Sequence, residues 1–133
     1  MKPTLTDVKN LIEQLAEKIH APKELLPTYG YPIDTGRTDI EIDSNGQIYY
    51  FPNERDRERY FLKDMDDLLY YIFNNVTHVM ATKHELSNRI RGKDTRRAWF
   101  IEQQRLLGIL NENWKLRKIK YHDQTLSKHP FLD

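Results

Sequence analysis

The chain has 133 residues, with 21 Lys and Arg against 20 Asp and Glu, and it contains no cysteine. This length predicts a single domain over residues 1–133, and the lack of cysteine excludes disulfides and thiolate chemistry. A formal net charge of +1 argues against a general nucleic-acid binder, which usually carries a larger positive excess. The first residues, MKPTLTDVKN, lack the apolar stretch of a signal peptide, and no apolar run has the length of a membrane span. We therefore expect a cytoplasmic protein with no membrane contact.

The first element is an amphipathic helix. Apolar residues recur at helical spacing from Val8 to Ile19, which predicts a helix with Thr6 as its N-cap and an end before Pro22. The next residues, PKELLPTYGYPIDTGR, are rich in Pro and Gly and predict a loop or a single helical turn.

A β-hairpin follows. Two alternating runs, TDIEID and QIYYF, flank Asn45 and Gly46, and Asn-Gly in this position is a strong hairpin signal. With these two residues at the centre of a type I′ turn, Ile42 faces Tyr49 across the hairpin. The buried face is then predicted to hold Ile40, Ile42, Tyr49 and Phe51, and the outer face Asp39, Glu41, Asp43, Ile48 and Tyr50. The run RYFLK predicts a third antiparallel strand.

The second half of the chain is predicted to be helical. Asp64 can cap a long helix whose apolar residues continue to Ile90, about seven turns. Gly92 predicts its end, because glycine enters the left-handed conformation at low cost, and Asp94 predicts the cap of a helix that ends near Leu110.

A last helix is expected over residues 114–126. Its apolar residues form two lines, one with Trp114 and Tyr121 and the other with Leu116, and both lines would need packing partners. The predicted fold class is α+β: an N-terminal helix, a small antiparallel sheet of about three strands, and three helices with a long central helix.

Catalytic motifs are missing from the sequence. The five histidines form no metal-binding pair at helical spacing, and the HE at His84 and Glu85 lacks the second histidine of H-E-x-x-H. No phosphate-binding glycine loop or nucleophile motif occurs. We therefore predict no catalytic residue, no metal and no cofactor. A hydrolase or nuclease that uses His84, Glu85 and His122 stays open, because these residues could meet in the fold.

Several segments occur in a recognisable order: LPTYGY, IEID with NG and YY, DMDDLLYYIFNNVTHVMA, DTRRAWF, EQQRLLGIL and the final HPFLD. This order resembles the immunity protein 63 family of bacterial polymorphic toxin systems. The resemblance implies a small protein that binds and neutralises a cognate toxin domain and thereby protects the producer cell and its kin. It implies no enzymatic activity and supplies no catalytic or toxin-binding residues.

Two surfaces are candidates for the toxin contact. The predicted outer face of the hairpin, with Asp39, Glu41, Asp43 and Tyr50, suits a basic toxin site such as a nuclease cleft. The interhelical turn, with Arg89, Arg91, Arg96 and Arg97, suits an acidic one. We favour the hairpin because an aromatic residue among carboxylates is typical of interfaces. The alternatives are that both are ordinary surface, or that the basic turn belongs to a small nucleic-acid-binding regulatory protein.

Overall fold

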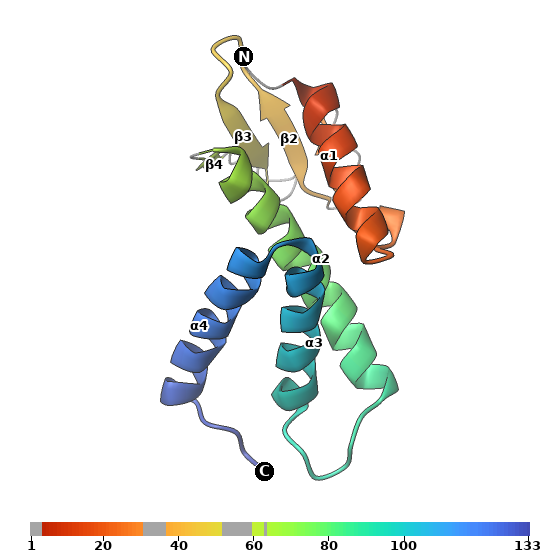
Figure 1. The fold of residues 1–133 in the computed structure, drawn as a ribbon, viewed down its shortest axis with the longest axis vertical. Helices are drawn as coiled ribbons and strands as arrows, with labels where there is room; N and C mark the ends of the chain where they lie inside the picture. Colours follow the sequence, from red (N-terminus) through yellow and green to blue (C-terminus); the bar gives the residue numbers. More distant parts are fainter. Residues whose placement is uncertain (1–3, 31–36, 52–59, 63) are drawn as a thin grey trace. The chain divides into compact units, whose positions relative to one another are not determined.

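The structure is a computed structural model that describes residues 4–30, 37–51, 60–62 and 64–133 (Figure 1). Its elements are α1 (Leu5–Lys18), the 3-10 helix η1 (Lys23–Leu25), β1 (Thr28–Tyr29), β2 (Asp39–Ile42), β3 (Ile48–Phe51), β4 (Tyr60–Leu62), α2 (Met65–Ser87), α3 (Thr95–Leu110) and α4 (Glu112–Lys128). The predicted α+β class is confirmed. The chain divides into two compact units, unit 1 (Met1–Ile72) and unit 2 (Phe73–Asp133), with the boundary inside α2. The single domain over residues 1–133 stays a prediction.

Helix α1 begins two residues earlier than predicted. Thr4, not Thr6, is the N-cap, because its hydroxyl accepts a hydrogen bond from the Asp7 amide while the Asp7 carboxylate accepts one from the Thr4 amide, both at 3.1 Å. This reciprocal capping box satisfies two amide hydrogens, whereas a single cap satisfies one. The helix buries Val8, Ile12 and Ala16 as the spacing predicted.

The sheet of unit 1 has the order β1-β2-β3-β4. Strands β2, β3 and β4 are antiparallel neighbours, as predicted. The sequence did not predict β1, which pairs with β2 in parallel and places Thr28 opposite Asp39. A strand of only two residues has too short a pattern to stand out in a segment dense in Pro and Gly.

The predicted hairpin register is wrong by one residue. The strands pair Ile42 with Ile48, and the loop between Asp43 and Gln47 has three residues instead of two. Within this loop, only Gly46 has a positive φ, 81°, whereas a type I′ turn requires two such residues. The Asp43 carboxylate also accepts hydrogen bonds from the amides of Asn45 and Gln47, both at 2.9 Å, and so stabilises the longer loop.

This register changes the composition of both sheet faces. One face carries Ile40, Ile42, Ile48 and Tyr50, and the other carries Asp39, Glu41, Tyr49 and Phe51. The first part of α2 packs on the former face, where the ring of Tyr71 lies 3.9 Å from that of Tyr50. The prediction that Ile40, Ile42, Tyr49 and Phe51 share one buried face is therefore wrong, because a one-residue shift exchanges the faces of one strand. Ile40 and Phe51 are buried, but they lie on opposite faces.

The long helix α2 begins as predicted and ends earlier. Asp64 accepts a hydrogen bond from the Asp67 amide at 2.9 Å. The helix stops at Ser87, and the last two members of the predicted stripe, Leu86 and Ile90, are 64% and 65% exposed. Gly92 has a φ of 86° in the turn that follows.

Helices α3 and α4 form unit 2 with the second part of α2. Asp94 caps α3 as predicted, accepting from the Arg96 amide at 3.0 Å. The amide of Gln103 on α3 donates to the Asn74 carbonyl on α2 at 3.0 Å. On α4, Trp114 is buried and lies 6.2 Å from the Phe73 ring, but Tyr121 and Leu116 are exposed. The expectation that both apolar lines of the last helix are packed is therefore wrong.

Candidate functional site

Asp39, the first residue of the predicted acidic surface, is fully buried in unit 1. Its carboxylate accepts a 2.7 Å hydrogen bond from the Thr28 hydroxyl and a 3.0 Å bond from the Gly30 amide. The prediction that Asp39 points outward is therefore wrong. The Asp39 carboxylate joins β1 to β2. The sequence did not predict this role, because it did not predict the neighbouring strand β1.

The other three residues of that surface do not share one face. Glu41 and Tyr50 lie on opposite faces of the sheet, and both are half-buried. Asp43 is exposed, but it lies in the turn, where its carboxylate holds the loop. A joint contact of these residues with a flat partner surface would thus involve Glu41 and Asp43 at most.

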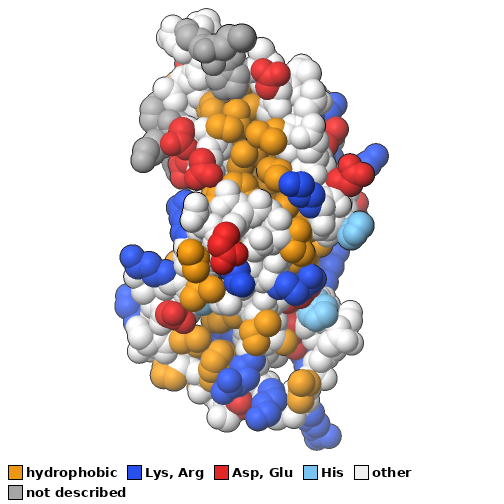
Figure 2. All heavy atoms as spheres, in the orientation of Figure 1, with side chains coloured by type: hydrophobic (Ala, Val, Ile, Leu, Met, Phe, Trp, Pro, Cys, Tyr) orange, Lys and Arg blue, Asp and Glu red, His pale blue; other side chains and the backbone are white. Residues whose placement is uncertain are grey.

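The arginines of the interhelical turn are mostly engaged within the protein. Arg89 forms a bidentate pair with Glu85 one turn earlier, at 2.8 and 3.0 Å, and this hydrogen bonding lowers the pKa of the Glu85 carboxyl. Arg91 is exposed. Figure 2 shows Lys and Arg side chains interspersed with Asp and Glu on the visible face, which is not the continuous basic field that nucleic acid favours.

Arg96 and Arg97 bind the C-terminal residues of the chain. Arg96 pairs with Asp94 at 2.9 Å, and it also donates to the carbonyls of His129 and Pro130 at 2.8 and 2.9 Å. The same pairing holds the pKa of the Asp94 carboxyl well below its usual range. Arg97 pairs with Asp133. The DTRR and HPFLD segments, which both entered the family resemblance, thus form one cluster.

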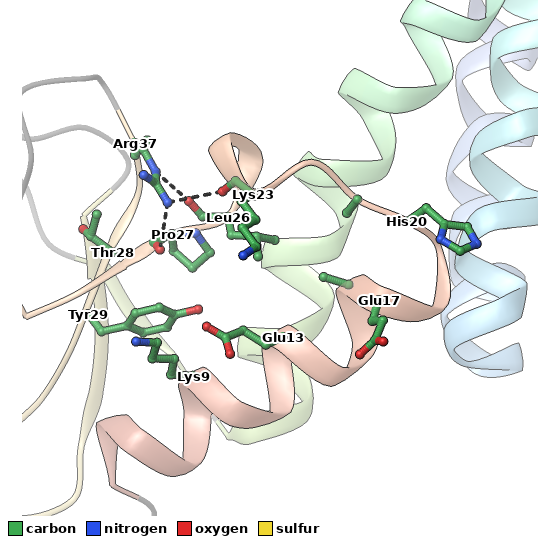
Figure 3. Close-up of a pocket in the computed structure, with 12 residues that line it drawn as sticks. Lys9, Glu13, Glu17, His20, Lys23, Leu26, Pro27, Thr28, Tyr29 and Arg37 are labelled. Carbon is green, nitrogen blue, oxygen red and sulfur yellow. Dashed lines mark hydrogen bonds between the residues drawn. The ribbon is translucent and has the colours of Figure 1, made fainter.

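Unit 1 contains a pocket of about 560 Å³ between α1 and the segment around β1 (Figure 3). Glu13 and Lys9 come from α1, and the Lys9 ammonium lies 6.0 Å from the Tyr29 ring. Arg37 lies on the opposite wall, where it donates to the Leu26 carbonyl at 2.8 Å. Both signs of charge line this pocket, so it has no clear preference for an anion or a cation.

Unit 2 contains a cleft of about 410 Å³ among α2, α3 and α4, which we call the unit 2 cleft. Its lining residues are Asn74, Asn75, His78, Arg96, Trp99, Phe100, Gln103, Lys118, Tyr121, His122 and Thr125. The lining includes two cations and two histidines, and none of these described lining residues is an acid. The sequence did not predict this cleft, because its walls come from three helices.

Burial controls the ionisation of the unit 2 cleft. Burial, followed by the charge of Lys118, lowers the pKa of His78, and burial with the charges of Lys118 and His78 lowers the pKa of His122 to about 4. The His122 ring stacks on Phe100 at 3.7 Å, and its Nδ1 lies 2.9 Å from the Gln104 amide nitrogen. A neutral ring can accept that bond, so the fold favours uncharged His122.

Within residues 4–30, 37–51, 60–62 and 64–133, no group of three or more His, Cys, Asp or Glu is placed to hold a metal ion. Over the same residues, no helix combines the length and apolar character required to cross a bilayer.

Comparison with known proteins identifies the family. The family model described as Immunity protein 63 matches residues 44–124, more than half of the chain. The chain belongs to the immunity protein 63 family. This immunity protein 63 match begins in the β2–β3 turn and ends in α4, so it includes Lys118 and His122 and excludes Asp39 and Glu41. No curated protein and no solved structure matches the chain.

Proposed function

We propose that this immunity protein neutralises a cognate bacterial toxin domain by forming a stoichiometric complex that covers the toxin's active surface. The observation that carries the proposal is the family match over residues 44–124. Such inhibition requires a complementary surface and no reaction centre, so protection should rise in proportion to the amount of immunity protein. We also propose that it acts in the cytoplasm, that it is not an enzyme, and that its partner is a toxin domain of a polymorphic toxin system, such as a nuclease.

Glu41 and Asp43 remain proposed contacts on the hairpin, since both reach solvent, whereas buried Asp39 is withdrawn. Among the turn arginines, Arg91 is the candidate for an intermolecular contact, because Arg89 already pairs with Glu85. These internal pairings also argue against the alternative of a nucleic-acid-binding regulator. Steeply salt-dependent binding of DNA or RNA at physiological ionic strength would restore that alternative.

The test is co-purification with the toxin domain encoded by the neighbouring gene. We expect a complex of fixed stoichiometry, survival of co-expressing cells, and recovery of full toxin activity once the complex is separated in denaturant. Permanent loss of toxin activity at a small molar fraction of the immunity protein would contradict the proposal, because only a catalyst acts below stoichiometry.

The hairpin contact has its own variant. Glu41→Gln removes the charge and keeps the shape, so affinity for a basic toxin surface should fall. Glu24→Gln, an exposed carboxylate of η1, is the matched control. Unchanged affinity of the Glu41 variant would remove the hairpin from the interface.

A further inference from the structure

We propose that the unit 2 cleft is a carboxylate-binding site whose cationic contact is Lys118. This inference rests on the proposed function. In the complex, the bound carboxylate belongs to an Asp or Glu side chain of the toxin.

Lys118 is a buried cation with an unusual environment. The residue is only 8% exposed, and among the described residues no carboxylate lies within ion-pairing distance of it. Its ammonium lies 4.4 Å from the centroid of the Tyr121 ring, a cation–π contact that compensates burial only in part. Burying a charge without an opposite partner costs free energy, and a bound carboxylate would offset that cost.

The charge of the cleft matches a single negative charge. Arg96 also lines the cleft, but Asp94 already neutralises it at 2.9 Å. His122 is buried, and His78 is exposed but loses part of its hydration where its ring lies 5.0 Å from that of Trp99. This desolvation and the charge of Lys118 lower the pKa of each ring, which favours the neutral forms. One cation is therefore left for the ligand, which favours a monoanionic carboxylate over a phosphate dianion.

The walls of the cleft carry polar atoms that the fold does not use. Asn74 Oδ1, Trp99 Nε1 and Gln103 Oε1 are buried, and within the described part of the chain they have no hydrogen-bond partner. Buried polar atoms in folded proteins are nearly always paired. Of these three, the Trp99 Nε1–H is the donor that a bound carboxylate can satisfy, because the two amide oxygens, like a carboxylate, only accept hydrogen bonds.

The cleft is open to a ligand on the side of α4. Tyr121 is 58% exposed and His78 is also exposed, so both can contact a ligand that enters from solvent. A volume of about 410 Å³ exceeds what one acidic side chain requires and leaves room for part of its backbone. Aromatic walls and one charged contact are typical of an interface anchor site.

The first test needs no toxin. N-acetylglutamate N-methylamide is titrated into the full chain and followed by NMR, with the glutamine analogue and inorganic phosphate as matched probes. We expect saturable shifts of the Lys118, His78 and Tyr121 side-chain signals with the glutamate probe, and a higher pKa of Lys118 when it is bound. Equal shifts with the glutamine probe, stronger binding of phosphate, or no shifts at all would overturn the proposal.

The second test uses the toxin complex. Lys118→Met keeps the length of the buried chain and removes the charge, so the fold should be as stable as before or more stable. We expect the dissociation constant to rise by about tenfold or more. Lys120→Met, an exposed neighbour on α4 that does not line the cleft, should leave it unchanged.

The outcomes separate the two proposals. Wild-type affinity of the Lys118 variant would overturn the toxin carboxylate as the ligand while leaving toxin binding intact. If the wild-type protein forms no toxin complex, the proposed function fails, and the titration of the isolated protein still decides whether the cleft binds a carboxylate.

Discussion

Arg97 and Asp133 are 36 residues apart in the chain, and the Arg97 Nε donates to both carboxylate oxygens of Asp133, at 3.0 and 2.9 Å. The Phe131 ring lies 4.1 Å from the Arg97 guanidinium, and the Asp94 carboxylate accepts from the Leu132 amide at 3.0 Å. These contacts hold the C-terminal residues against the start of α3. Arg97 therefore has a structural role at the C-terminus.

Substitution of Arg97 should release the C-terminal segment. In Arg97→Ala, we expect faster amide hydrogen exchange at Leu132, whose amide is held by Asp94, and little change in the core amides of α3. Arg91→Ala is the control, because this arginine is exposed and takes part in none of the hydrogen bonds or ion pairs described for the tail. Unchanged exchange at Leu132 would mean that Arg96 and Asp94 hold the segment without Arg97.

Loss of the Asp39 carboxylate should destabilise unit 1. Asp39→Ala leaves the Thr28 hydroxyl and the Gly30 amide without their acceptor, so we expect the free energy of unfolding to fall by about 1 to 3 kcal/mol. Asp43→Ala should cost less, because the amides that it releases lie in an exposed turn and can bond to water. Urea unfolding measures both, and a reversed order would contradict the placement of Asp39 in the core.

Truncation of Phe73 should lower the free energy of unfolding more than loss of the Asp39 carboxylate does. Its side chain is fully buried beside Trp114, so Phe73→Ala is expected to cost about 3 to 5 kcal/mol, a large part of the stability of a small domain. Ile101→Ala, at a residue that is 67% exposed, should change the melting temperature little. Equal melting temperatures for the Phe73 variant and the wild type would exclude the packing of α2 on α4.

His122 should make the protein sensitive to acid. Its pKa is about 4 in the folded chain against an ordinary value of 6.5, so between these pH values the unfolded chain binds a proton that the folded chain does not. Stability therefore falls as the pH drops through this window, with a slope of up to about 1.4 kcal/mol per pH unit from this residue. His122→Phe keeps the stack on Phe100 and removes the proton. If urea unfolding of the variant shows the same pH dependence as the wild type, His122 is not the cause.

The sequence by itself determined the helices and most of the strands of this protein. Helical spacing and the Asp94 cap predicted α3, and Asp64 and Gly92 bounded the region of α2, because these signals act between residues close together in the chain. The order of segments also indicated the immunity protein 63 family, which the family match then showed.

Only the tertiary structure decided the register of the hairpin and the places of the polar residues. A three-residue loop rather than a two-residue turn moved Glu41 and Tyr50 to opposite faces, and the neighbouring strand β1 buried Asp39. The environment of Lys118 likewise depends on α2, α3 and α4 together. Burial and charge pairing arise between residues far apart in the chain. Local spacing therefore could not predict that Lys118 lies in a cleft, or that it has no carboxylate partner among the described residues.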